Sequence, residues 1–221
     1  MECVKAPQFM EDPATFALSQ AAEADFPTEY GLFRICGFEG RTTSPTGPAQ
    51  PRIEEAVVLK MGDVHNGPPP LLRIHSQCLT GDVFHSLRCD CRAQLEIALR
   101  EISAEGRGLI VYELQEGRGI GLMNKLRAYE LQDRGADTVE ANEQLGFESD
   151  LRNYSLPGAI LRHLAIPSVR LMSNNPDKVR ALEEAGIVVA ERVPCIAAAH
   201  ESRRGYLETK REKMGHLFEG A

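Results

Sequence analysis

Three cysteines lie within fourteen residues of one another, at Cys78, Cys89 and Cys91. The Cys-x-Cys pair can reach one ion with both thiolates, and the ten residues after Cys78 allow the chain to fold back and supply the third. A zinc ion with three protein thiolates keeps one coordination position for water, as catalytic rather than structural zinc does. Any fold of this chain must therefore bring residues 78–91 together, and the cluster indicates a metallohydrolase.

Spacing alone leaves two other interpretations of the cluster open. A closed structural site would take His75 or His85 as its fourth ligand, and both lie close enough in sequence. The three residues can also be buried thiols that bind no metal, since free cysteine is among the most buried residue types.

Composition places the chain among ordinary globular proteins. It has 221 residues, of which 43% are hydrophobic and 26% charged, enough to bury one sizeable core. Half of the six cysteines sit in one cluster, which favours metal binding in a reducing cytosol over a disulfide framework. No apolar run reaches the length of a membrane span, and the net charge of −7 argues against a nucleic-acid-binding surface. We expect a cytoplasmic protein with neither a membrane nor a nucleic acid as partner.

Hydrophobic periodicity predicts an α/β fold. Apolar runs predict strands at 29–36, 55–60, 71–75, 109–112, 169–172 and 187–190. Amphipathic spacing predicts helices at 93–104, 123–133, 156–164 and 177–185. This alternation indicates a mixed sheet flanked by helices, with an antiparallel N-terminal part, in a single domain. Residues 1–25 lack clear periodicity and are predicted to be an N-terminal extension that can be flexible. The catalytic domain is predicted to span residues 26–221.

Two loops have the composition of phosphate-binding turns. The glycine-rich run at 115–121 follows a predicted strand and precedes a predicted helix, a position in which backbone amides can approach a phosphate. It matches neither the Walker A nor the dinucleotide fingerprint. The run at 173–178 follows the next strand, and its Lys178 can act as a point charge on phosphate.

These segments together resemble the GTP cyclohydrolase II family. The resemblance rests on Arg-x-His-Ser-x-Cys-Leu-Thr-Gly-Asp at 73–82, Ser-Leu-Arg-Cys-Asp-Cys at 86–91, Gln-Glu-Gly-Arg-x-Ile-Gly-Leu at 115–122, Asn-Lys-x-Arg-Ala-Tyr-x-Leu-Gln-Asp at 124–133, Asp-Thr-Val-Glu-Ala-Asn at 137–142, Leu-Gly-Phe-x-x-Asp-x-Arg at 145–152, Asn-Asn-Pro-x-Lys at 174–178 and Lys-Met-Gly-His-Leu at 213–217. It runs from about residue 27 to 218 without a break.

The resemblance implies a zinc- and magnesium-dependent homodimer that opens the imidazole ring of GTP. Such an enzyme releases formate and pyrophosphate and leaves 2,5-diamino-6-ribosylamino-4(3H)-pyrimidinone 5′-phosphate, at the first step of riboflavin synthesis. One zinc per chain would be held by Cys78, Cys89 and Cys91, and magnesium would accompany the triphosphate.

The resemblance also implies roles for individual residues. GTP would be bound by Arg73, Ile74, His75, Ser76, Gln77, Gln94, Glu116, Gly117, Arg118, Thr138, Ser173 and Lys178. Tyr129 would serve ring opening, and Asp150 and Arg152 would act as base and nucleophile at the α-phosphate. A guanidinium with a pKa above 12 is a poor nucleophile, which leaves charge stabilisation at the phosphate as the alternative for Arg152. Glu116 can accept hydrogen bonds from guanine N1–H and the 2-amino group.

Two rival functions stay open at this point. One is a variant that hydrolyses C8 and the triphosphate but stops at the formamidopyrimidine product, which the presence of Tyr129 disfavours. The other is a zinc-stabilised GTP-binding module without turnover, which a zinc-ligating His85 would favour.

Overall fold

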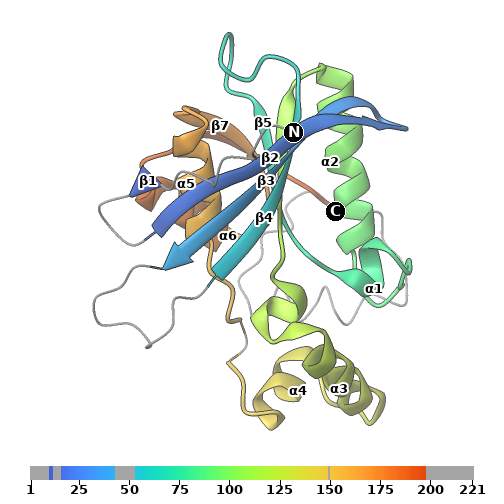
Figure 1. Ribbon diagram of the computed structural model, residues 1–221. Coiled ribbons are helices and arrows are strands. Elements are labelled where there is room, and N and C mark those ends of the chain that lie inside the picture. The colour runs from blue at the N-terminus through green and yellow to red at the C-terminus, as the bar shows by residue number, and fades with distance from the viewer. Residues whose placement is uncertain (1–9, 12–15, 43–52, 149, 198–221) are drawn as a thin grey trace, which may run out of the picture.

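The structure is a computed structural model that describes residues 10–11, 16–42, 53–148 and 150–197 (Figure 1). The motif at 213–217 lies outside the described residues. Eight strands form one sheet in the order β1-β2-β3-β4-β6-β5-β7-β8. Their bounds are β1 Met10–Glu11, β2 Phe16–Thr28, β3 Gly31–Thr42, β4 Ile53–Met61, β5 Leu71–Ser76, β6 Gly108–Glu113, β7 Ser168–Met172 and β8 Val188–Val193.

The direction of pairing changes within the sheet. β1 to β4 pair in antiparallel fashion, as does β4 with β6, whereas β5 pairs in parallel with β6 and β7, and β7 with β8. Short turns can join antiparallel strands, while parallel neighbours need a crossover that is usually a helix. The predicted single-domain α/β fold, with a mixed sheet and an antiparallel N-terminal part, is confirmed.

Some of the helices form the crossovers between parallel strands, whereas α3 (Gly121–Asp133) and α4 (Thr138–Gln144) pack on each other apart from the sheet (Figure 1). The bounds of the others are α1 Leu79–Asp82, α2 Cys91–Glu105, η1 Glu116–Gly119, α5 Ser155–His163 and α6 Pro176–Glu184. The four predicted helices correspond to α2, α3, α5 and α6. The short elements α1, η1 and α4 were not predicted. None of the described helices is both long and apolar enough to cross a membrane.

The expectation of a loose extension over residues 1–25 is wrong for residues 16–25. β2 runs from Phe16 and pairs with β3 through to the turn at Thr28. Residues 21–26 are exposed, so this part of the strand carries no alternation of apolar and polar side chains. The periodicity was absent because the hairpin projects into solvent there, while the backbone ladder still forms.

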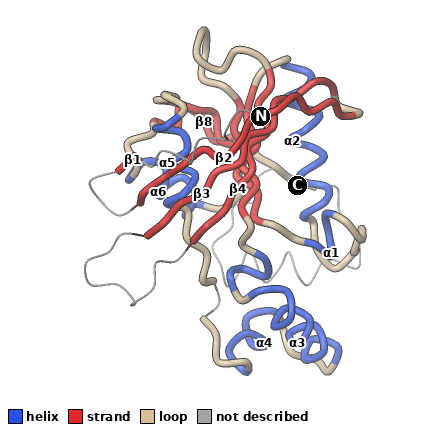
Figure 2. Tube along the Cα trace, in the orientation of Figure 1, coloured by secondary structure: helices blue, strands red, loops and turns tan. Residues whose placement is uncertain are grey.

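Two cores lie on opposite faces of the sheet, with α2 covering one face and α5 and α6 the other (Figures 1 and 2). Side chains along a strand alternate between faces. In β5, Leu72 and Ile74 join the α5 and α6 core, while Leu71 joins the α2 core. Arg73 shares the face of Leu71 and donates a hydrogen bond to Gln94 of α2. The alternation along β5 therefore places Arg73 and His75 on the α2 side.

Close packing of α5 against α6 gives a stability prediction. A Cβ at Gly158 would overlap the Cβ of Ala185, so Gly158→Ala should lower the free energy of unfolding by about 1–3 kcal/mol. Urea unfolding measures the loss. Adding Ala185→Gly should recover part of it, because the overlapping methyl is removed. Equal losses in the single and double variants would contradict this account of the contact.

Candidate active site

A cavity of about 650 Å³ opens where the parallel strands β5, β6 and β7 end. Parallel strands bring the residues that follow their carboxyl ends to one edge of the sheet, the usual ligand position in α/β folds. α3 and α4 lie beyond this edge, packed on each other apart from the sheet (Figures 1 and 2). The sequence-predicted residues that line the cavity are Arg73, His75, Ser76, Gln77, Cys78, Cys89, Cys91, Gln94, Glu116, Gly117, Arg118, Tyr129, Thr138, Arg152, Ser173 and Lys178.

Two predicted residues do not line the cavity. Ile74 points into the opposite core, and only its carbonyl contributes, by accepting a hydrogen bond from Lys178 Nζ at 2.8 Å. Asp150 accepts two hydrogen bonds from the Arg152 guanidinium, at 2.8 and 2.5 Å. Burial opposes ionisation of Asp150, but the bonds from Arg152 outweigh it and lower its pKa. Asp150 is thus an ionised carboxylate that orients Arg152.

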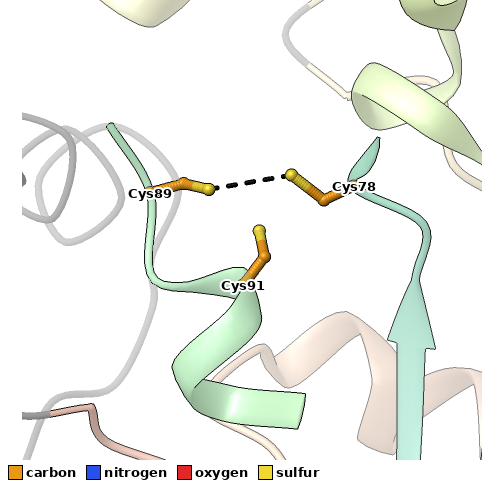
Figure 3. Close-up of side chains that lie close together, drawn as sticks. All are labelled: Cys78, Cys89 and Cys91. Atoms are coloured by element: carbon orange, nitrogen blue, oxygen red, sulfur yellow. Dashed lines mark hydrogen bonds between the residues drawn. The ribbon is translucent and has the colours of Figure 1, made fainter. Parts of the chain in front are cut away.

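The three cysteines come from three adjacent segments and their sulfurs converge (Figure 3). Cys78 precedes α1, Cys89 lies in the following loop and Cys91 begins α2. The three Sγ atoms lie within 4.8 Å of one another, with 3.7 Å between Cys78 and Cys89. Among the described residues, no histidine or carboxylate joins this group. His85 is exposed, and His75 Nε2 lies 3.1 Å from the Asp82 carboxylate, so the arrangement favours an open metal site.

Two local features fit the thiols to a soft divalent ion such as zinc. A Cβ at position 81 would lie 2.9 Å from Cys89 Sγ and 3.1 Å from Cys78 Sγ, so Gly81 keeps the space beside the sulfurs clear. The Cys78 and Cys89 sulfurs also lie within hydrogen-bond distance of each other. Hydrogen bonds from Cys89 and Cys91 lower the pKa of Cys78, and the bond to Cys78 raises the pKa of Cys89 to about 11. Three thiols already within bonding reach of one another need little rearrangement to bind zinc.

Glu116 and Lys125 connect the glycine-rich loop to the cysteine segment. Glu116 accepts hydrogen bonds from Leu79 N at 2.6 Å, Gly117 N at 2.9 Å and Lys125 Nζ at 2.7 Å. Lys125 Nζ also lies 3.1 Å from Cys78 Sγ. Lys125 belongs to the motif at 124–133 but was not among the predicted site residues. Its spacing, four residues before Tyr129 in α3, places both on one helix face and was the available signal.

Tyr129 lies beside the thiols. Its hydroxyl is 3.2 Å from Thr80 Oγ1, which in turn is 3.6 Å from Cys78 Sγ. The Arg88 guanidinium lies over the tyrosine ring, 4.8 Å from its centroid. Burial raises the pKa of Tyr129, so the phenol keeps its proton near neutral pH and can donate it.

Arg73 and His75 each offer a buried polar atom to a ligand. Arg73 donates to Met172 O at 2.9 Å and Gln94 Oε1 at 2.6 Å. Burial lowers the pKa of His75 although Asp82 opposes the effect, so the ring is neutral and its Nε2–H donates to Asp82. Within the described part of the chain, Arg73 Nε and His75 Nδ1 are buried without a hydrogen-bond partner. The first is a donor and the second an acceptor.

The segment around Arg152 is fastened to the end of β6. Leu151 N donates to Arg118 O at 3.0 Å, and Gln115 exchanges hydrogen bonds with the backbone of Asn153 at 2.6 and 2.9 Å. Gln115 also donates to Glu113 at 3.0 Å. Glu113 is fully buried, and burial raises its pKa to about 7 even though Lys178 and Arg152 lie near. No sequence motif indicated Glu113. It directly follows the apolar run at 109–112, so its position in the sequence is that of an ordinary first loop residue.

Fold and cavity define an α/β protein with a three-cysteine centre among cationic side chains. The GTP cyclohydrolase II family matches residues 19–194, a span that begins within β2. The GTP cyclohydrolase-2 of Actinobacillus succinogenes is 52% identical over 201 residues, 91% of this chain and 88% of its own. Those of Azotobacter vinelandii and Pseudomonas syringae pv. tomato are 53% and 54% identical over 89% of this chain and 90% and 92% of theirs. The chain belongs to the GTP cyclohydrolase II family, and it is a hydrolase.

The buried Glu113 predicts a pH dependence of stability. Its folded pKa of about 7 lies above the ordinary value of 4.5, so between these pH values the unfolded chain releases a proton that the folded protein retains. Stability from this group therefore falls as pH rises through that window. In Glu113→Gln this fall should be absent. The free energy of unfolding of the variant relative to that of the parent should therefore rise by on the order of 2 kcal/mol from pH 5 to pH 8. Urea unfolding at both pH values tests this. Glu101→Gln, at an exposed position, is the control. If the free energy of unfolding changed with pH in the same way in Glu113→Gln and in this control, the prediction would be contradicted.

Proposed function

We propose that this protein hydrolyses GTP at guanine C8 and at the α-phosphate. The reaction releases formate and pyrophosphate and gives 2,5-diamino-6-ribosylamino-4(3H)-pyrimidinone 5′-phosphate, the first step of riboflavin synthesis. The observation that carries the proposal is that one cavity is lined both by the three cysteines and by Arg118, Arg152 and Lys178. Family membership supports the remaining parts of the proposal. These are a cytoplasmic location, a homodimer, and magnesium bound with the triphosphate.

Cys78, Cys89 and Cys91 would hold one zinc per chain and leave its fourth position to water. When bound, zinc supplies a Lewis acid that makes water nucleophilic near neutral pH. Tyr129 stays protonated beside the thiols, and its hydroxyl would donate a proton as the imidazole ring opens. Its presence there supports hydrolysis through to formate over arrest at the formamidopyrimidine.

The cationic side of the cavity would bind the triphosphate. Arg152 is held by the ionised Asp150 and Lys178 by the Ile74 carbonyl, so both cations are fixed before a ligand arrives. Preorganised charge of this kind stabilises the negative charge that develops at a phosphate under attack. A guanidinium keeps its proton and is a poor nucleophile, and that of Arg152 is also engaged by the Asp150 carboxylate, which favours charge stabilisation over nucleophilic attack.

The guanine end would lie toward Glu116. An ionised carboxylate has about four acceptor sites, and three of those on Glu116 accept bonds from Leu79, Gly117 and Lys125. The geometry thus supports one hydrogen bond from guanine rather than the two considered from sequence. Arg73 Nε and His75 Nδ1 would supply further polar contacts, with Ser76, Gln77, Gln94, Gly117, Thr138 and Ser173 lining the rest.

Assays of formate and pyrophosphate in parallel test the proposal and separate its two chemistries. The parent should release both. Cys89→Ser should lose zinc, because a neutral hydroxyl is a poorer ligand than a thiolate, and formate production should collapse. Pyrophosphate release can persist in this variant, with GMP as product. Arg152→Ala should suppress pyrophosphate release, and formate as well if attack at the α-phosphate comes first.

Each other outcome of these assays has a distinct meaning. Folded, zinc-free Cys89→Ser that makes formate at the parent rate would show that zinc is structural and the mechanism wrong. Pyrophosphate without formate from the zinc-loaded parent, with the formamidopyrimidine rather than GMP as the nucleotide product, would identify the variant that stops at the formamidopyrimidine. GTP binding without either product would identify a binding module. Metal analysis and circular dichroism on every variant distinguish loss of zinc from loss of fold.

Replacement of Glu116 tests base selection. Glu116→Gln keeps the shape but removes a charged acceptor, so kcat/KM for GTP should fall tenfold to a thousandfold, on the order of a few kcal/mol. Inosine triphosphate lacks the 2-amino group and serves as the matched substrate control. If Glu116 accepts from that group, the preference of the parent for GTP over inosine triphosphate should narrow in the variant. Unchanged GTP kinetics would reduce Glu116 to a structural role in the turn.

A further inference from the structure

Lys125 lies between the Cys78 sulfur and the Glu116 carboxylate at the wall of the cavity. Its Nζ lies 3.1 Å from Cys78 Sγ and 2.7 Å from Glu116 Oε1. The side chain is only 12% exposed, so these contacts are made largely out of water. An ammonium group has three donors and no acceptor, and two of them are directed to these partners.

We propose that Lys125 is a positioning residue of the metal centre, whose ammonium group tunes the charge of the three-thiolate site through its hydrogen bond to Cys78. The inference rests on the proposed function in that the thiolates hold zinc. Three thiolates around a divalent ion carry a formal charge of −1, and a partly buried net charge is costly without a counter-ion. Lys125 supplies that counter-ion in direct contact with one ligand atom.

The surrounding chain is built to hold the ammonium group at the sulfur. Gly117 adopts φ +62°, and a Cβ there would approach Lys125 Cβ to 3.1 Å, so glycine makes room for the lysine stem. Glu116, fixed by two backbone N–H groups, anchors the ammonium from the other side. A simple ion pair with Glu116 would not require the sulfur to lie within hydrogen-bond distance.

The hydrogen bond makes Cys78 unlike the other two ligands. A cationic donor to a thiolate draws electron density from the sulfur, which weakens its donation to the metal and leaves the metal a stronger Lewis acid. The same positive charge would also offset the net negative charge of the metal-loaded site, which favours metal binding. Loss of the ammonium group should therefore weaken metal binding and change the electronic spectrum of the site, independently of GTP.

Metal binding by the full-length protein tests the inference. Zn²⁺ affinity is measured by competition with a chromophoric chelator, and the Co²⁺-substituted protein gives the thiolate-to-metal charge-transfer band. Lys125→Met should weaken Zn²⁺ binding tenfold to a hundredfold, about the usual effect of removing an outer-shell partner. Its charge-transfer band should move to longer wavelength, because the sulfur loses its cationic donor. Lys125→Arg should retain more of the affinity than Lys125→Met.

Two further variants identify the cause of any loss. Arg127→Met removes an exposed cation from the same helix and should match the parent. Lys125→Met combined with Glu116→Gln removes both partners of the ion pair. It should keep the defect if the contact with Cys78 matters, whereas parent values would assign the loss to an uncompensated Glu116 and overturn the inference. Should Lys125→Met fail to fold, Lys125→Gln carries the same test.

The outcomes separate this inference from the proposed function. Unchanged Zn²⁺ affinity and an unchanged Co²⁺ spectrum in Lys125→Met would overturn the role of Lys125, even if the parent makes formate. If the parent makes no formate but Lys125→Met shows the expected loss of Zn²⁺ affinity and change of the Co²⁺ spectrum, the role of Lys125 is supported and the proposed reaction is overturned.

Discussion

Parallel pairing of β5 with β6 is the constraint on which the site depends. Their register places Ser76 opposite Glu113, so the residues that follow both strands leave the sheet at the same height. Leu79, which follows Cys78, consequently donates to the Glu116 carboxylate at 2.6 Å across 37 positions of sequence. A one-residue slip of β5 would send Arg73 to the opposite core and remove it from α2. The strand register therefore fixes which side chains can meet in the cavity.

Charge in the cavity is arranged in neighbouring pairs. The pairs are Asp150 with Arg152 and Glu116 with Lys125, while Glu113 lies near Lys178 and Arg152. A buried charge without a partner costs several kcal/mol, so these pairs let the fold keep its cations inside before any phosphate binds. A polyanionic ligand would then meet cations already oriented by carboxylates, and little reorganisation would accompany binding.

How far the sequence determines this arrangement differs from element to element. The strands at 71–75 and 109–112 were predictable because both are buried and nearly continuous in apolar residues. β2 was not, since its exposed half carries no period. α4 is short, and its only signal is the capping box of Asp137 and Glu140. The cysteine cluster was predictable from spacing, whereas Lys125 and Glu113 meet their partners only through tertiary contacts that no local pattern encodes.

The loop η1 joins the two chemical halves of the cavity. At one end, Glu116 holds Leu79 and Lys125, and through them the segment that carries Cys78. Two residues later, the Arg118 carbonyl accepts a hydrogen bond from Leu151, directly before Arg152. Arg118 itself adopts φ +61°, a conformation that is unfavourable for a residue with a side chain and that the surrounding contacts must maintain. One short strained turn thus connects the cysteines to the cations proposed to bind phosphate, and a change in its backbone would displace both groups at once.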